Sequence, residues 1–541
     1  MSKVKKEGFV QGILALMCSQ VIIKILGLVY SMYLTNREGF GDSGNAIYMS
    51  GYQVYALLLT LSSIGVPNAI AKLVSERLAL GDKKGADRIF KIAFVTFAFI
   101  GFCGTLLLYL GAGVIANSWL QIPEAEYTLM TLSPAIFFVS ISSVIRGYFN
   151  ARQKMSATAR SQTIEQVFKT SLTIIIVEIV AICTKVNTEL MAAGANLATT
   201  FATFLSFSYI YALYRMNSKE EAKTVDTTLK TTEKKESARS IIKKILSVSI
   251  PISLSSLLSS INKNIDSVTV VRLLKPLIGE ATAKTKYGIL SSKVDILTSM
   301  PLAFNIAFAT ALVPAISAAR VKNDTDTINK RLRFSILITI LIGLPCTFGM
   351  FIYAKQILEL LFPNASSGGT LLAISAFTII FTVLAQTING ALQGLGKIKV
   401  PAIALGCGVV VKLITNLVLI PIEGIYENGA AIGSVLCHIV SFTIVYNVLK
   451  RTVKLDFSIS KMIIKPLIIT IIMSAISYAT YRGLMIVGIS SLISTVIGII
   501  IAVIVYAILV IVFRILSKED IYMLPNGEKI YKILQKIRIY N

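Results

Sequence analysis

Apolar runs of about 20 residues or more alternate with short polar stretches along almost the whole chain. A helix that crosses a bilayer needs about 20 mostly apolar residues. Fourteen runs meet this requirement, at 9–34, 44–66, 90–115, 126–149, 159–183, 188–214, 245–272, 287–312, 333–354, 370–393, 400–421, 428–449, 462–481 and 489–514. The pattern therefore predicts an all-α polytopic membrane protein with fourteen transmembrane helices.

The composition agrees with a membrane protein, and in this class the net positive charge has an explanation other than nucleic-acid binding. Of the 541 residues, 55% are hydrophobic and 15% are charged, whereas about 25% are charged in a typical soluble domain. The formal net charge of +25 would indicate a nucleic-acid partner in a soluble protein. Here Lys and Arg gather in alternate loops, as they do on the cytoplasmic side of membrane proteins. We therefore expect no nucleic-acid partner.

The same loops predict the orientation of the chain. The N-terminus and the loops after the second, fourth and eighth runs are basic, whereas the loops at 117–126 and 422–427 lack Lys and Arg. By the positive-inside rule, both termini are expected in the cytoplasm. The predicted outer loop 273–286 is an exception to this rule, because it contains Lys275, Lys284 and Lys286.

Two repeated sequence patterns indicate that the first twelve runs form two related halves. Residues 145–177 align without a gap over 388–420, so that Gly147 meets Gly390 and Lys169 meets Lys412. A Val-Pro pair at 66–67 recurs at 313–314, each time before a basic loop. The two halves have the same orientation, so we expect parallel repeats with a substrate site between them. The paired glycines would allow neighbouring helices to approach closely.

A polar and charged stretch separates the halves. It has too few apolar residues to bury a core and is expected to be a solvated linker. The predicted parts are an N-terminal six-helix lobe at 1–215, a cytoplasmic linker at 216–240, a C-terminal six-helix lobe at 241–450, and two additional transmembrane helices with a cytoplasmic tail at 451–541.

Charged residues inside the predicted spans are the candidates for function, because a charge at mid-bilayer costs about 2.5–3.5 kcal/mol on insertion scales. The candidates for substrate binding are Lys24, Lys263, Lys293, Lys169, Arg272, Arg37 and Lys412. The candidates for gating or structural ion pairs are Glu165, Asp266, Arg146, Gly147 and Gly390. No catalytic group and no metal site is predicted, since the six cysteines are widely spaced and His438 is the single histidine.

Structural interpretations compete with these assignments. Glu165 and Lys169 are four residues apart and could pair on one helix face, and Lys263 and Asp266 could do the same at a spacing of three. Arg272 and Arg37 lie near outer helix ends, where long side chains reach the interface. Lys24 has no acid in its own span and is the strongest functional candidate.

Lys293 is the next strongest candidate. Asp295 is close to it in sequence, but residues two apart on a helix do not face each other. Ser, Asn and Tyr in the second and seventh runs, such as Tyr52 and Asn264, would supply polar surface. Those tyrosines could equally form an interfacial belt.

Three motifs resemble a known family. "RGYFNARQKMSATARSQTIEQ", "YGILSSKVDILTSMPLAFNIAFATALVPAIS" and "ALQGLGKIKVP" are similar to the polysaccharide-transport branch of the multidrug/oligosaccharidyl-lipid/polysaccharide (MOP) exporter superfamily. The resemblance covers nearly the whole chain. It implies a MATE/MurJ-like fold in a bacterial plasma membrane, with two six-helix lobes around a cavity that opens alternately to each side.

The resemblance also implies the cargo. It points to a flippase that moves a polyprenyl-pyrophosphate-linked sugar to the outer leaflet, either a peptidoglycan precursor or another cell-envelope polysaccharide unit. The implied partners are this lipid-linked oligosaccharide, membrane lipids and cell-wall synthesis proteins, with the chain acting as a monomer. No cofactor is implied, and ion coupling and the membrane potential are both open as energy sources.

Three other functions compete with a lipid-linked sugar flippase. A membrane glycosyltransferase or ligase would need catalytic groups in a sizeable outer loop, and the predicted outer loops are short, so we expect no enzymatic activity. A multidrug/cation antiporter of the same fold would favour acids in the cavity, where this chain has more bases. A non-transporting scaffold for cell-wall or spore-cortex assembly is the third alternative.

Overall fold

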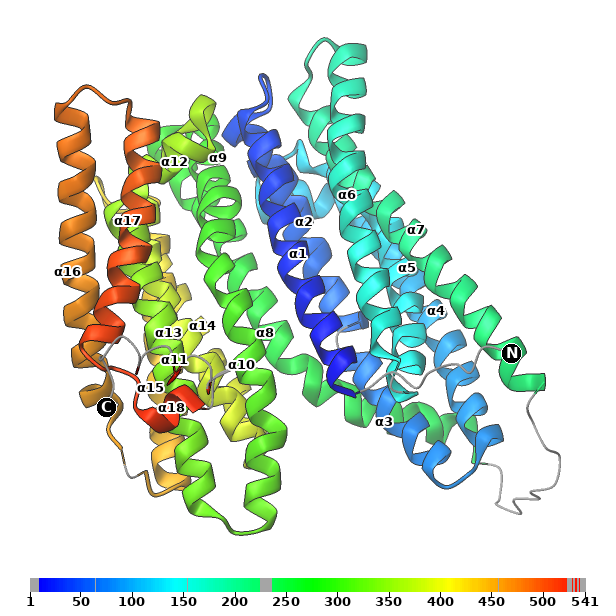
Figure 1. Ribbon diagram of the computed structural model, residues 1–541. Coiled ribbons are helices and arrows are strands. Elements are labelled where there is room, and N and C mark those ends of the chain that lie inside the picture. Colours follow the sequence, from blue (N-terminus) through cyan, green and yellow to red (C-terminus); the bar gives the residue numbers. More distant parts are fainter. Residues whose placement is uncertain are drawn as a thin grey trace. The chain divides into compact units, whose positions relative to one another are not determined.

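The computed structural model describes residues 9–522 except 64, 153, 224–235 and 456, together with residues 528, 531, 532 and 535 of the C-terminal tail. Every regular element among these described residues is a helix (Figure 1). The helices form two compact units. The first unit is Met1–Ile296 with Asn416–Glu427, and the second is Leu297–Thr415 with Asn428–Asn541.

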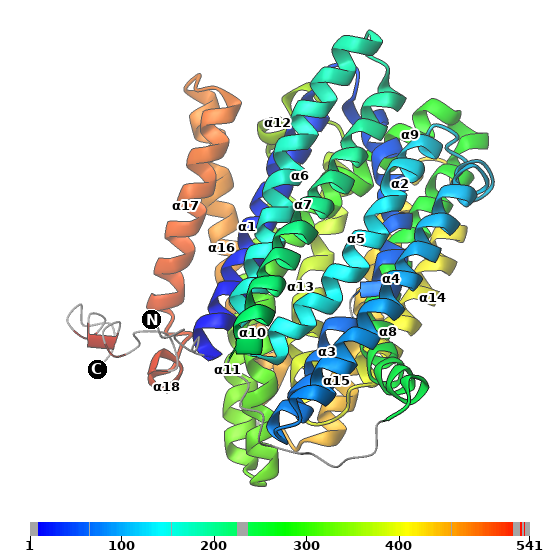
Figure 2. The same cartoon turned by 90° about the vertical axis from the view of Figure 1, so that its right-hand side faces the viewer.

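The first unit is built around α5, whose surface is largely buried. Helices α2, α3, α4 and α7 pack on α5, while α1 packs on α6, and α6 and α7 run side by side in both views (Figures 1 and 2). Its elements are α1 (Phe9–Asn36), α2 (Gly41–Ser63), α3 (Gly65–Ala79), α4 (Lys83–Val114), η1 (Ile115–Leu120), α5 (Ala125–Ala151), α6 (Met155–Thr184), α7 (Thr188–Lys223), α8 (Ala238–Ile278), α9 (Glu280–Gly288) and η2 (Ile289–Val294).

The second unit is built around α13, which packs on α11 and α15. Helices α16 and α17 lie side by side and pack on α11, and the hydroxyl of Tyr506 donates to the carbonyl of Leu341 at 3.0 Å. Its elements are α10 (Asp295–Val321), α11 (Thr325–Ile352), α12 (Ala354–Leu361), η3 (Pro363–Ala365), α13 (Gly369–Gly394), α14 (Val400–Leu419), α15 (Asn428–Thr452), α16 (Ile459–Ile486), α17 (Ser491–Val512) and α18 (Lys518–Tyr522). The first two residues of α10 and the last four of α14 belong to the first unit.

Eleven stretches of the described residues are long and apolar enough to cross a membrane, and each coincides with a predicted span. The other three predicted spans, at 9–34, 245–272 and 287–312, fall on α1, α8 and the η2–α10 segment, which are also helical. Large apolar side chains such as Leu107, Ile182 and Val503 point outward, as expected for helices that face lipid. The prediction of an all-α polytopic membrane protein is confirmed.

Helices α7 and α8 extend into the predicted linker. Helix α7 continues to Lys223, and α8 begins at Ala238 after the side chain of Ser237 caps it by accepting from the amide of Ser240. The remaining linker residues, 224–235, lie outside the described residues, as do Lys3, Lys5 and Lys6. The first compact unit also extends past the predicted lobe boundary at 241, since it contains α8 and α9.

Neutral hydrogen bonds attach α8 to the first unit along what we call the α8 seam. The seam consists of Thr60 with Ser260 at 2.8 Å, the Asn264 amide donating to the Gln53 carbonyl at 3.0 Å, and the Gly65 amide donating to the Ser253 hydroxyl at 3.0 Å. All three contacts join α8 to α2 or to the start of α3. The seam therefore explains why α8 groups with the helices that precede the linker.

Gly147 and Gly390 both lie where two helices approach closely. A Cβ on Gly147 would stand 2.9 Å from the Pro67 carbonyl oxygen of α3. A Cβ on Gly390 would overlap the Ala309 carbonyl oxygen of α10. Each glycine thus faces the backbone of the helix that carries a Val-Pro pair in its own unit, where only a residue without a side chain fits.

The contact at Gly390 leads to a stability prediction. We expect Gly390→Ala to lower the free energy of unfolding by about 1–3 kcal/mol, because the backbone of α10 must move to admit the methyl group. Thermal unfolding of the purified protein in detergent measures this. Gly349→Ala is the matched control, since a Cβ there meets no atom within 4 Å. Equal unfolding temperatures for the two variants would contradict the close approach.

Candidate functional site

Three charged side chains from three helices come together in the first unit. The Lys263 ammonium of α8 lies 3.7 Å from the Asp295 carboxylate at the start of α10, and Lys24 of α1 interacts electrostatically with both. The side chains of Lys263 and Asp295 are 48% and 33% exposed. We call Lys24, Lys263 and Asp295 the cationic cluster, because the group combines two ammonium groups with one carboxylate.

The cationic cluster lies deep along its helices. Lys24 is near the middle of α1, roughly 20 Å along the axis from either end at about 1.5 Å per residue. A charged side chain exposed to hydrocarbon at this depth would be costly, so membrane proteins turn such groups toward a protein interior or an aqueous space. Lys263 and Asp295 are partly exposed, so a ligand can reach their charged groups.

Lys169 on α6 is buried among aromatic rings. Its ammonium lies 4.1 Å from the centroid of the Tyr52 ring and 5.2 Å from that of Tyr30. Tyr48 completes the group, since its ring stacks on Tyr52 and meets Tyr30 edge-on. The faces of these rings attract the cation. The charge of Lys169 is therefore compensated by α1 and α2, and not by the acid on its own helix.

That acid, Glu165, has another partner. Its carboxylate accepts from the Arg146 guanidinium of α5 at 2.8 Å. Arg146 also donates to the hydroxyls of Ser161 and Ser206, so it joins α5, α6 and α7. The expected pairing of Glu165 with Lys169 along one helix is thus replaced by contacts between helices.

Lys293 has no exposed surface and forms an ion pair with Asp42, with 2.8 Å between its ammonium and one carboxylate oxygen. Lys293 belongs to the π-helical segment η2, and Asp42 lies in the first turn of α2. The two helices touch closely at this point, because a Cβ on Gly288 would overlap the Asp42 carbonyl. Sequence reasoning missed Asp42, which lies two residues before the second predicted span, 44–66.

Asp266 also bonds to another element and not to Lys263. Its carboxylate accepts from the Asn416 amide at 3.0 Å, and that amide also lies 3.0 Å from the Thr269 hydroxyl. Arg272 is exposed near the end of α8, and Lys412 is buried in α14. Arg37 follows α1 directly and donates two hydrogen bonds, at 2.8 and 2.9 Å, to Glu178 near the end of α6.

The lysines that run against the positive-inside pattern are neutralised by acids. Lys284 lies 2.6 Å from Glu124 and 2.7 Å from Glu280, and Lys286 lies 2.6 Å from Glu427. Hydrogen bonds from Lys275 and Lys284 lower the pKa of Glu280 to about 2, so this carboxylate is ionised at neutral pH. These pairs account for Lys residues in a loop expected outside, since paired ammonium groups add little net charge.

The described residues contain no group of three His, Cys, Asp or Glu side chains placed to hold a metal ion. The chemistry of the site is thus that of its ammonium groups and the polar and aromatic groups around them. Such groups can bind an anion by charge and by hydrogen-bond donation.

The chain matches two family models and is similar to two named bacterial proteins over most of its length. The family model described as "Polysaccharide biosynthesis protein" matches residues 9–320, and the model "MatE" matches residues 251–418. Stage V sporulation protein B of Bacillus subtilis (strain 168) is 26% identical over 532 residues, which cover 96% of this chain and 98% of that protein. Lipid II flippase MurJ of the same strain is 24% identical over 489 residues, 86% of each chain.

A solved structure shows the same fold. The structure titled "Lipid II flippase MurJ, inward closed conformation" superposes with a TM-score of 0.68 and 15% identity, covering 92% of this chain and 98% of that one. The predicted MurJ-like arrangement of helices is therefore present.

The buried Lys293–Asp42 pair leads to a prediction. Lys293→Met should lower the free energy of unfolding by about 3–5 kcal/mol, because it leaves the Asp42 carboxylate buried without its countercharge. Adding Asp42→Asn to this variant should restore most of the loss, since no uncompensated charge is then left. Thermal unfolding of both variants in detergent checks this. A single variant as stable as the parent would show that the pair is dispensable.

Proposed function

The chain belongs to the polysaccharide biosynthesis protein family of the MOP exporter superfamily, and from this premise we propose that it is an alternating-access flippase for a polyprenyl-pyrophosphate-linked sugar. The family is one of transporters and not of enzymes. The cargo would move from the cytoplasmic to the outer leaflet. Similarity to proteins named stage V sporulation protein B and lipid II flippase MurJ supports a cell-envelope cargo, either a peptidoglycan precursor or a related unit.

The cationic cluster is the observation that carries this proposal. A pyrophosphate group bears several negative charges and many acceptor oxygens, and ammonium groups supply both charge and donors. The three side chains of the cluster carry two positive charges and one negative charge, a formal sum that suits an anionic ligand. In a site shielded from bulk water this attraction is stronger than in solution. We assign Lys24 and Lys263 to the pyrophosphate.

The other substrate-binding candidates take supporting positions in this proposal. Lys169, Lys293 and Lys412 are almost fully buried, so we propose that they act through the protein around them and not by direct contact with the cargo. Arg37 and Arg272 lie near helix ends, so we propose that they contact the cargo at the outer side of the membrane, where it is released. The paired helices α16 and α17 expose many apolar side chains, which suits them to contact the polyprenyl chain.

The charge balance favours a flippase over a multidrug/cation antiporter of the same fold. An antiporter binds cations and would need an excess of carboxylates at mid-depth. The cationic cluster has one carboxylate and two ammonium groups. A non-transporting scaffold for wall or spore-cortex assembly would need no cationic cluster and is distinguished by the experiment below.

The finer architecture follows from the same proposal. We propose that fourteen helices cross the membrane, because α1 and α8 have 28 and 41 residues and about 20 suffice. The glycine contacts at Gly147 and Gly390, which are alike in both units, support lobes at 1–215 and 241–450 that are related as parallel repeats. The termini and the linker at 216–240 would lie in the cytoplasm of a bacterial cell, and ion coupling or the membrane potential would supply the energy.

Transport in proteoliposomes tests the function. Lys24→Ala should abolish flipping of a polyprenyl-pyrophosphate-linked sugar while the protein is still made at a normal level, because Lys24 is needed for the ligand and not for folding. Lys24→Arg should retain part of the rate, since it keeps the charge and changes the shape.

Lys355→Ala is the matched control for this experiment. Lys355 is a lysine whose side chain is 77% exposed, and it pairs with Glu359 on its own helix α12, so the flipping rate should not change. A wild-type rate for Lys24→Ala would contradict the proposed role of the cationic cluster. Full biological activity of a variant that does not transport would favour the scaffold.

Cysteine labelling tests the orientation. In a background without the native cysteines, Ser218→Cys near the end of α7 should react only with a reagent that enters the cytoplasm. Ser118→Cys in η1 should react with an impermeant reagent applied to intact cells. Labelling of both positions from outside would exclude the proposed topology.

A further inference from the structure

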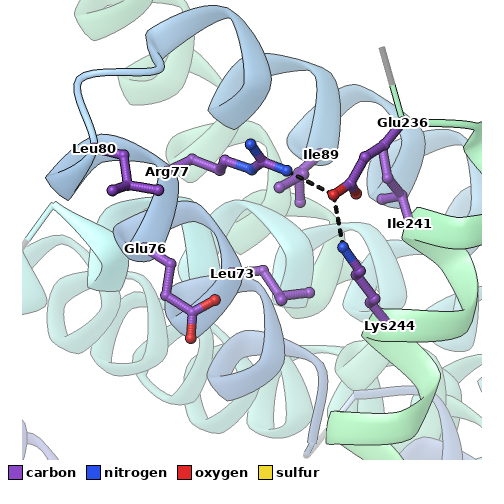
Figure 3. Close-up of a pocket in the computed structure, with 8 residues that line it drawn as sticks. All are labelled: Leu73, Glu76, Arg77, Leu80, Ile89, Glu236, Ile241 and Lys244. Atoms are coloured by element: carbon purple, nitrogen blue, oxygen red, sulfur yellow. Dashed lines mark hydrogen bonds and ion pairs between the residues drawn. The ribbon is translucent and has the colours of Figure 1, made fainter. Parts of the chain in front are cut away.

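A pocket of about 620 Å³ lies in the first unit, apart from the cationic cluster, where the end of α3 meets the beginning of α8 (Figure 3). Apolar side chains of Leu73, Leu80, Ile89 and Ile241 line it. Arg77 of α3 and Lys244 of α8 lie among them. Its size lies within the range of pockets that take small ligands, about 300–1,000 Å³.

Two cations from different helices converge on one oxygen in this pocket. Oε1 of Glu236 lies 2.7 Å from a guanidinium nitrogen of Arg77 and 2.6 Å from the Lys244 ammonium, as Figure 3 shows. The pocket therefore already holds an oxyanion, and that oxyanion is supplied by the chain itself. The Lys244 side chain is about half exposed, so a ligand can reach this position from solvent.

The surroundings contain both acids and bases, and the bases are in excess. Glu76 lines the pocket, and Asp82 lies 3.3 Å from the other terminal nitrogen of Arg77. Exposed basic residues lie on the same three segments, at Lys72 of α3, Lys83 and Lys84 of α4, and Arg239 and Lys243 of α8. They belong to the basic side of the chain, which we propose faces the cytoplasm. Surface charge of one sign raises the local concentration of ligands of the opposite sign.

We propose that this pocket binds the phosphate group of an anionic ligand, with Arg77 and Lys244 as its direct partners and Glu236 as a built-in competitor. A guanidinium group presents two parallel donors that match phosphate oxygens, and the ammonium adds a point charge. The phosphate takes the position that the Glu236 carboxylate occupies, and Glu236 turns to solvent. The hydrogen bond from Lys244 lowers the pKa of Glu236, so at neutral pH it competes as an anion.

The phosphate could belong to a phospholipid headgroup or to a soluble ligand, and only the phospholipid would also use the apolar residues of the pocket. A phospholipid headgroup would bring acyl chains to Leu73, Leu80 and Ile89, and Leu80 is 72% exposed at the end of α3. A soluble phosphate would use only Arg77 and Lys244. Both share the same anionic group, and this inference stands independently of the proposed flippase activity.

Binding to the purified full-length protein in detergent tests the site. The probes are dioctanoyl phosphatidylglycerol, dioctanoyl phosphatidylcholine and inorganic phosphate, measured by calorimetry. We expect saturable binding of phosphatidylglycerol that the double variant Arg77→Gln, Lys244→Gln weakens by about tenfold or more, since two charge-assisted hydrogen bonds are lost. Glu236→Gln should tighten binding by about fivefold, because the competing carboxylate loses its charge.

The controls separate the outcomes. Lys322→Gln removes an exposed lysine that follows α10 in the second unit and should leave binding unchanged. Inorganic phosphate that binds as tightly as phosphatidylglycerol would identify a soluble ligand for the same site. The gain of affinity in Glu236→Gln cannot come from misfolding, and the unfolding temperature of each variant is measured alongside. Absence of saturable binding by any probe, or parental binding by the double variant, would overturn the proposal.

Discussion

The cost of a charge inside a membrane is the constraint on which the rest of this structure depends. Each ammonium group within a spanning helix must be compensated, or the helix would be expelled from hydrocarbon. In the first unit this requirement decides which helices touch. Lys293 brings η2 to the start of α2 through Asp42, and Arg146 gathers α5, α6 and α7 around Glu165 and two serines. The fold of this unit is therefore organised by charge compensation as much as by apolar packing.

The compensating groups differ from one position to the next. Lys293 has a carboxylate at 2.8 Å, and Lys169 has the faces of Tyr52 and Tyr30. The cationic cluster combines two ammonium groups with one carboxylate, and its Lys263 lies 3.7 Å from Asp295. Buried pairs that are fully satisfied contribute to specificity of structure and have little left to offer a ligand. The cationic cluster has more ammonium groups than carboxylates and is partly exposed, and this is why we propose the pyrophosphate site there.

The sequence predicts the elements well and their partners poorly. Span positions follow from runs of about 20 apolar residues, and the glycines at 147 and 390 are recognisable because a repeat aligns them. The partner of Lys293 lies 251 residues away in the chain, and nothing local to Lys293 indicates it. Spacing along a helix shows only which residues can meet, so it left open the same-helix pairs of Glu165 with Lys169 and of Lys263 with Asp266. In the structure, Glu165 pairs with Arg146 and Lys263 with Asp295, each on another helix.

The α8 seam shows how such a structure can still move. A transporter that opens alternately to two sides must separate and rejoin helices without leaving charges stranded in hydrocarbon. The seam is made of neutral hydrogen bonds between Ser, Thr, Asn and backbone groups. Bonds of this kind contribute about 0.6 kcal/mol each in a membrane protein, with a maximum near 1.7. Breaking three of them therefore costs a few kcal/mol at most. That is within the range that the differential affinity of a ligand for two conformations can supply. An ion pair such as Lys293–Asp42 would cost far more to separate. It also joins the two proposed lobes, since Asp42 lies in 1–215 and Lys293 in 241–450. In the proposed flippase, the neutral seam is therefore the contact that separates at low cost, whereas the ion pair would keep η2 attached to α2.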